Sequence, residues 1–134
     1  MPSWWDKLLG RDKAPGKADA MGDRGENLAA TYLRKQGMKI LERNFRCSVG
    51  EVDIVAREGQ TLVFVEVKSR AYDDPAPEDQ ITPDKQHRLT KAGKVYLGRF
   101  GVEPPARFDV VAVIFPTGQP PIIRHTPNAF EATF

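Results

Sequence analysis

The chain has 134 residues, of which 40% are apolar, and this is the ordinary size of a single domain with one core. It has one cysteine, Cys47, which excludes an intrachain disulfide framework and a cysteine-rich zinc site. No stretch approaches the roughly 20 apolar residues of a membrane span, and the N-terminus lacks the apolar core of a signal peptide. We therefore expect a soluble, cytoplasmic protein.

Charge is distributed unevenly along the chain, although its formal net value is only +2. Residues 1–48 carry a net charge of +4, residues 49–80 carry −5, and residues 81–134 carry +3. A fold that joins these segments would place carboxylates among cations, which suits metal ions held beside a phosphate backbone. Interspersed surface charge explains the same pattern without any function.

Residues 1–20 are predicted to form a flexible N-terminal tail, and residues 21–134 a single nuclease-like domain. The tail contains Trp4 and Trp5, followed by Leu8 and Leu9, at the spacing of one amphipathic helical turn. Such a turn is too short to be stable alone, so it would need a protein partner or a membrane surface.

The remaining sequence predicts helices and strands in the order α-β-β-β-α-β-β. The first helix begins near Asp23, where Asp23 and Glu26 resemble a capping box, and it ends at Gly37. Strands follow at residues 38–47, 50–56 and 61–68, then a helix at 82–98, a buried strand at 108–115 and a short strand near Ile122 and Ile123. This order is typical of a mixed sheet with helices on both faces.

A predicted β-hairpin places charged side chains on one face of the sheet. With Glu58 and Gly59 in the turn, Asp53 opposes Phe64 and lies diagonally across from Glu66. Period-two alternation then puts five side chains on one face, namely Glu51, Asp53, Phe64, Glu66 and Lys68, while Val52, Ile54, Val63, Val65 and Val67 take the other.

Two explanations fit this arrangement. Carboxylates about 7 Å apart repel by roughly 2.4 kcal/mol at an effective dielectric of 20, so a cation must offset them. Lys68 could do so on a solvated sheet face. Alternatively, Asp53 and Glu66 could bind Mg²⁺ or Mn²⁺, which prefer carboxylate oxygens, with Lys68 beside the phosphate or the attacking water.

Several separated blocks of the sequence resemble one family. GEVDIVA, VFVEVKSR, RFDVVAV and PNAF are similar to the YraN-like bacterial proteins, a family of the PD-(D/E)xK nuclease superfamily related to archaeal Holliday-junction resolvases. The resemblance runs from Gly22 to Phe130 and implies a restriction-endonuclease-like α/β/α core. Val52 replaces the proline of the superfamily's name.

The resemblance implies roles for particular residues. Asp53 and Glu66 would bind a divalent ion, with the backbone carbonyl of Val67 as a further ligand, and Lys68 would orient water or stabilise the pentacovalent phosphate. Glu26 would complete the metal shell or its surroundings, although a capping-box glutamate needs no such role. Glu51 is a weaker candidate ligand.

Other polar residues are candidates for nucleic-acid contacts or for a solvated surface. The candidates for nucleic-acid contacts are Arg70, Lys85, Gln86 and Arg88. Lys91 and Lys94 add positive charge to the predicted helix at residues 82–98. His87 and His125 lack metal-ligand spacing and are interpreted as surface residues, and Asp109 is interpreted as organising a strand end.

Three functions follow as hypotheses. The first is a magnesium-dependent, endonuclease-like hydrolase that cleaves DNA, including branched or flapped forms, and resolvase-type chemistry would require a homodimer. The second is a nucleic-acid-binding module that keeps the fold with little or no catalysis. The third is an adaptor that binds a protein partner through Trp4 and Trp5.

Overall fold

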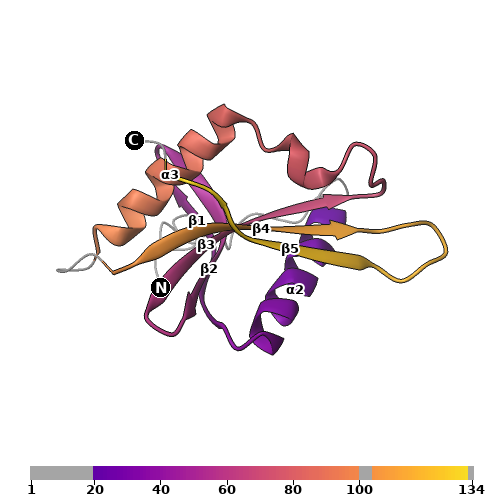
Figure 1. The fold of residues 1–134 in the computed structure, drawn as a ribbon, viewed down its shortest axis with the longest axis horizontal. Coiled ribbons are helices and arrows are strands. Elements are labelled where there is room, and N and C mark those ends of the chain that lie inside the picture. The colour runs from indigo at the N-terminus through magenta and orange to yellow at the C-terminus, as the bar shows by residue number, and fades with distance from the viewer. Residues whose placement is uncertain (1–19, 100–103, 133–134) are drawn as a thin grey trace, which may run out of the picture.

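The fold is a five-stranded mixed sheet covered by one α-helix on each face (Figure 1). The computed structural model describes residues 20–99 and 104–132. The helices are α2 (Ala20–Lys35) and α3 (Pro83–Leu97), with a 3₁₀ helix η2 (Pro77–Gln80), and the strands are β1 (Lys39–Cys47), β2 (Gly50–Glu58), β3 (Thr61–Arg70), β4 (Ala106–Ile114) and β5 (Ile122–Phe130). The predicted tail, with Trp4 and Trp5, lies outside the described residues.

Strand pairing follows the chain, in the spatial order β1-β2-β3-β4-β5. The pairs are antiparallel except for β3 and β4, which run parallel and are connected through η2 and α3. The predicted mixed sheet with a helical crossover is therefore confirmed. Two details differ from the expectation, because η2 interrupts the loop before α3 and β5 has nine residues instead of a short segment.

Helix α2 begins three residues before the predicted start. Asp23 consequently lies within the first turn, so the predicted capping box with Glu26 is wrong. The predicted end is confirmed, since Gly37 has a φ of 93° and the N–H of Met38 donates to the carbonyl of Leu33. Glu26 is thus free of a capping role and is available for other contacts.

Two hydrophobic clusters fill the space on either side of the sheet. Helix α2 packs its buried Ala29, Ala30 and Leu33 against Val65 and other strand residues on one face. Helix α3 packs Leu89, Ala92 and Tyr96 on the other face, with Phe64. Strand β4 is buried from Phe108 to Ile114, which confirms the prediction that it is covered on both sides.

The register of the β2–β3 hairpin differs from the prediction by two residues. Glu58 pairs with Thr61, so the turn consists of Gly59 and Gln60, and the ladder ends at Ile54 and Val65. Gly59, with a φ of 60°, supplies the left-handed conformation that this two-residue turn requires. Asp53 and Glu66 are the next residues on each strand, beyond the last pair of the ladder, and their carboxyl groups interact.

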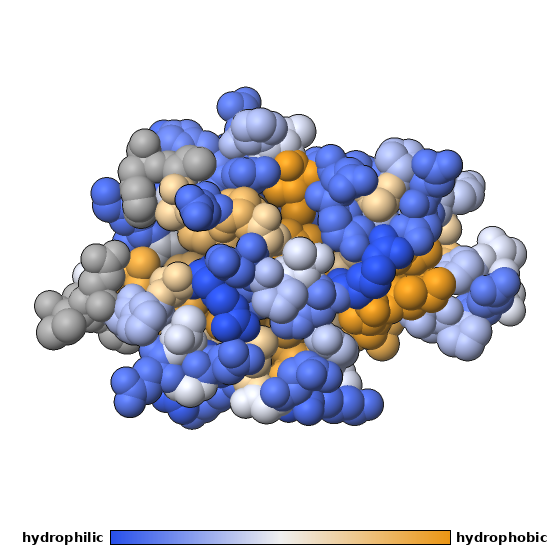
Figure 2. Space-filling view, in the orientation of Figure 1, coloured by the Kyte–Doolittle hydropathy of each residue, from blue (hydrophilic) through white to orange (hydrophobic). Residues whose placement is uncertain are grey.

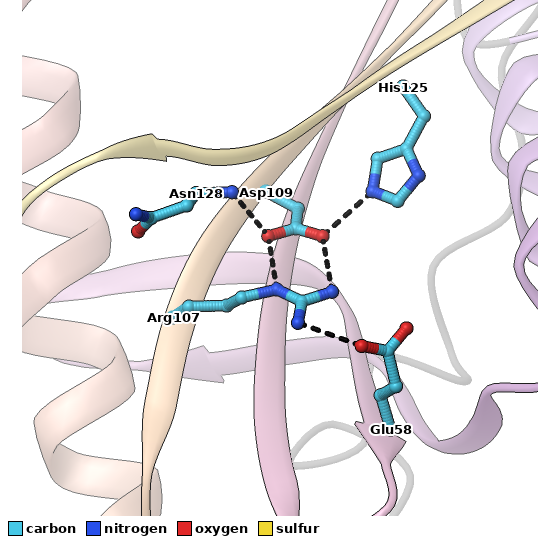
Figure 3. A network of polar contacts seen from close by, with 5 residues as sticks. All are labelled: Glu58, Arg107, Asp109, His125 and Asn128. Carbon is cyan, nitrogen blue, oxygen red and sulfur yellow. Dashed lines mark hydrogen bonds and ion pairs between the residues drawn. The ribbon is translucent and has the colours of Figure 1, made fainter.

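A polar network attaches β5 to β4 (Figure 3). Asp109, which is 1% exposed, accepts hydrogen bonds from Arg107 at 3.0 and 3.3 Å and from the Asn128 backbone N–H at 2.9 Å, and it contacts His125 Nε2 at 2.7 Å. The network lies at the irregular pairing between Phe108 and Val110. Asp109 therefore organises this strand pair, as expected, whereas the surface interpretation of His125 is wrong.

The surface in Figure 2 is largely hydrophilic, with hydrophobic patches showing between the charged side chains. In the described part of the chain, no helix is both long and apolar enough to cross a membrane.

Candidate functional site: a buried carboxylate pair beside two lysines

Asp53 and Glu66 meet where the hydrogen-bond ladder between β2 and β3 stops. The backbone N–H of Val67 donates to Oδ2 of Asp53 at 2.8 Å, so a side chain takes the place of the next backbone partner. The period-two pattern breaks at the same point: Val52 packs in the cluster under α3, whereas Ile54 packs in the cluster under α2. The prediction that Val52 shares the face of Ile54 is therefore wrong.

Two lysines lie beside the carboxylate of Glu66. Nζ of Lys68, on the same strand, is 3.9 Å from Oε1 of Glu66, and Nζ of Lys85, on α3, is 3.4 Å from the same atom. The Glu66 side chain is 5% exposed, and the lysine side chains are 18% and 25% exposed. The predicted grouping of Asp53, Glu66 and Lys68 is thus present, with Lys85 as an additional member.

Glu26 approaches the pair from α2. Its Oε1 lies 3.4 Å from Nη2 of Arg43, and it is close enough to Asp53 for their charges to interact. Gly25 makes this approach feasible, because a Cβ at position 25 would lie 1.7 Å from Oγ of Ser69. The missing side chain allows α2 to pack tightly against β3.

The three carboxyl groups are electrostatically unfavourable as a set. Burial, together with the charge of Asp53, raises the pKa of Glu26 to about 7 and that of Glu66 to about 8. Burial also raises the pKa of Asp53, against the hydrogen bond from Val67 that lowers it. Lys85 and Lys68 lower the pKa of Glu66 but do not restore its ordinary value. The neighbouring lysines therefore do not fully offset the negative charge that the three carboxyl groups would carry when ionised.

Two observations bear on whether a divalent cation fits. Oε2 of Glu66 is buried and has no hydrogen-bond partner in the described part of the chain. Within the same residues, no three Asp, Glu, His or Cys side chains are grouped closely enough to hold a metal by themselves. Asp53 and Glu66 therefore suit a cation such as Mg²⁺, which keeps several waters and binds through one or two carboxylates.

Several other predicted site residues are engaged elsewhere. Glu51 is exposed and pairs with Arg46 at 3.2 Å. Arg70 donates to Oε1 of Gln80 at 3.0 Å, and Gln86 donates to the carbonyl of Ile81 at 3.2 Å. Arg70 and Gln86 therefore stabilise the loop before α3.

The inward orientation of Lys85 was missed because it was grouped with the outward-facing cations of α3. Its spacing could have revealed it, since Lys85 precedes the buried Leu89 by four residues and Ala92 by seven. Thr82 caps the helix by accepting from the Lys85 N–H, which fixes Lys85 in the first turn.

The fold and site together define an α/β protein with a mixed five-stranded sheet and a pair of carboxylates flanked by lysines, in which Glu66 is buried and Asp53 is half-buried. A family model described as "Uncharacterised protein family UPF0102" matches residues 25–113, a range that includes Glu26, Asp53, Glu66 and Lys68. The chain belongs to this family, as its resemblance to the YraN-like proteins led us to expect.

Relatives in other bacteria carry the same family name. A UPF0102 protein of Geobacter metallireducens is 48% identical over 117 residues, covering 86% of this chain and 95% of the relative. One from Geotalea uraniireducens is 43% identical over 129 residues, covering 95% and 100%. One from Herminiimonas arsenicoxydans is 47% identical over 94 residues, covering 69% and 76%.

Proposed function

We propose that the protein is a divalent-metal-dependent phosphodiesterase that hydrolyses nucleic acid, with DNA as its substrate. The carrying observation is the Glu66 carboxylate, which is buried beside Asp53 and within 4 Å of two ammonium groups. One of its oxygens has no hydrogen-bond partner among the residues that the structure describes. Burying such a carboxylate pair costs stability, and functional sites commonly retain a cost of this kind.

Each residue would have a separate role. Asp53 and Glu66 would hold Mg²⁺ or Mn²⁺, with the carbonyl of Val67 available as a further ligand. A divalent ion bound there would polarise the phosphate and lower the pKa of a coordinated water. Lys68 would orient that water or stabilise the negative charge that develops on the phosphate.

Glu26 would act from the other side of the pair. Burial raises its pKa to about 7, so this carboxyl can accept or release a proton near neutral pH. Arg43 holds it in place at 3.4 Å. We assign Glu26 to the water and proton network around the ion, because it is bound to Arg43 and is not grouped with Asp53 and Glu66 as a direct ligand.

The helix-flanked mixed sheet and the order Asp53, Glu66, Lys68 also support membership of the PD-(D/E)xK superfamily with its restriction-endonuclease-like core. Asp53 lies on β2, and Glu66 and Lys68 lie on the adjacent strand β3. Branched DNA and a dimeric enzyme are the corresponding proposals for substrate and assembly.

A binding module without catalysis is the second candidate. It is favoured by the two lysines, which can neutralise Glu66 without any metal. Under this alternative the carboxylate pair would be a structural element of the fold.

The two candidates are separated by a cleavage assay on linear, flapped and four-way DNA with Mg²⁺, Mn²⁺ or no metal. The first predicts cleavage that requires metal and is lost in Asp53→Ala, Glu66→Ala and Lys68→Ala. Lys35→Ala, at an exposed position on α2, is the matched control and should cleave normally. Cleavage that persists in Lys68→Ala would exclude the assigned site.

A further inference from the structure

A groove borders the carboxylate site on the α3 side. The β1–β2 turn, residues 47–50, forms one wall, and Lys85, Arg88 and Leu89 of α3 form the other, enclosing about 380 Å³. Glycine at position 50 allows the turn to approach α3 closely, because a Cβ there would lie 2.7 Å from the carbonyl oxygen of Arg88. The turn and the helix are therefore in backbone contact at the base of the groove.

The groove carries more positive than negative charge. Arg46, Lys85 and Arg88 line it with one carboxylate, Glu51, which is already paired with Arg46. Arg88 is exposed and forms no ion pair within residues 20–99 and 104–132. Guanidinium groups bind phosphate oxygens through paired hydrogen bonds, so an unpaired arginine in a groove is suited to a phosphodiester.

Lys85 connects the groove with the site. It lines the groove, and its Nζ also lies 3.4 Å from Oε1 of Glu66. A phosphate bound at Arg88 would therefore lie on the same side of the sheet as the carboxylate pair, with Lys85 between them.

We propose that this groove binds the backbone of one nucleic-acid strand, and that Arg88 and Lys85 hold phosphates adjacent to the one at the carboxylate pair. The proposal rests on the proposed function for the nature of the ligand. It assigns the strand a path along the first turns of α3 and past the β1–β2 turn. We take a single strand as the occupant, because the groove encloses only about 380 Å³.

The test is fluorescence anisotropy of labelled single-stranded DNA, and of the blunt duplex of the same sequence, in buffer with EDTA between about 50 and 200 mM salt. Arg88→Gln is expected to bind single strands roughly ten-fold more weakly and to reduce the salt slope by about one. Ser48→Glu, which adds a negative charge at the exposed turn, should weaken binding similarly. Lys35→Gln removes the same charge at an exposed position on α2, outside the groove, and should change affinity by less than about two-fold.

The outcomes separate this proposal from the proposed function. Equal effects of Arg88→Gln and Lys35→Gln, no DNA binding at all, or an Arg88 effect confined to the duplex would overturn the assignment of the groove. Loss of single-strand binding in both groove variants supports it, even if no metal produces cleavage. If Arg88→Gln cleaves DNA and binds it with unchanged affinity, the proposed hydrolase activity is retained and the groove is excluded as the binding site.

Discussion

Gly25 on α2 lies against Ser69 on β3 with no room for another atom, since a Cβ at position 25 would be 1.7 Å from Oγ of Ser69 and 2.9 Å from its Cβ. We predict that Gly25→Ala destabilises the protein by about 1–3 kcal/mol, because the helix must move away from the sheet. Urea denaturation measures this change. Gly22→Ala, where nothing lies within 4 Å, is the control and should not destabilise.

The same contact can be tested by a double variant. Replacing Ser69 by glycine removes the atoms that an alanine at position 25 would meet, so Gly25→Ala should cost less in a Ser69→Gly background. Equal costs in both backgrounds would show that the two residues are not coupled.

Glu66 makes stability depend on pH in a defined direction. Its folded pKa of about 8 exceeds the ordinary 4.5, so the folded protein holds this proton more tightly than the unfolded chain does. The stabilisation is complete below pH 4.5 and is lost as pH rises to about 8. We expect Glu66→Gln to reduce this slope and to stabilise the metal-free protein by roughly 1–2 kcal/mol at the upper end.

Denaturant titrations across this pH range measure the slope. Glu131→Gln is the matched control, because Glu131 is exposed and lies outside the carboxylate group, so the slope should stay as it is. Parallel curves for the wild type and Glu66→Gln would contradict the assignment of a buried, protonated carboxyl.

Divalent metal should stabilise the fold through the same carboxylates. We expect Mn²⁺ to raise the melting temperature by a few degrees at pH 8 and by less at pH 5.5, because protons compete for Asp53 and Glu66. Asp53→Asn should abolish the shift, whereas Asp84→Asn, at an exposed position, should retain it. A shift of the same size in Asp53→Asn would place the metal elsewhere.

Asp109 should contribute to stability independently of the site. Burial alone would raise its pKa, but hydrogen bonds from His125, Arg107 and the Asn128 backbone outweigh burial and lower it. Its stabilisation is therefore present above the ordinary value of 3.8 and is lost as pH falls through the lower folded value. We predict that Asp109→Ala costs roughly 2–4 kcal/mol at pH 7 in urea denaturation, because it leaves buried donors unpaired.

Glu58, at the outer end of the network around Asp109, provides the control for Asp109→Ala. Glu58 accepts from Arg107 at 2.9 Å but is 47% exposed, so Glu58→Gln should cost no more than about 1 kcal/mol. A cost as large as that of Asp109→Ala would mean that the whole network, and not its buried carboxylate, sets the stability.

Arg124 on β5 connects the loop after β3 to the sheet. It donates to Asp73 at 2.6 and 2.7 Å and to Glu78 at 2.8 Å. We predict that Arg124→Ala changes global stability by no more than about 1 kcal/mol but accelerates amide hydrogen exchange in residues 71–80. Unchanged exchange there would show that η2 and its own contacts order the loop.

Local patterns in the sequence were sufficient to predict most of the fold. Apolar periodicity located both helices and all five strands, and the Thr82 cap and Gly37 terminator gave helix ends that the structure confirms. The hairpin register was missed because Glu58 and Gly59 also suit a turn, and the choice between the two turns depends on long-range packing of β2 and β3 that a short window does not contain.

Only part of the site was predicted, because some of its contacts join segments that are far apart in the sequence. Asp53, Glu66 and Lys68 lie on neighbouring strands, so their meeting follows from hairpin geometry. Lys85 reaches Glu66 only because α3 crosses the sheet above it, and His125 is buried only because β5 extends to Tyr32 and Asp109. Contacts of this kind depend on tertiary structure.

The carboxylate pair lies in the sheet with Lys68, while two further charged neighbours come from the helices on opposite faces, Glu26 from α2 and Lys85 from α3. Separation of either helix from the sheet would move its charged residue away from the carboxylate pair before the sheet itself unfolds. Loss of this arrangement should therefore precede any change in bulk spectroscopic probes of β-structure.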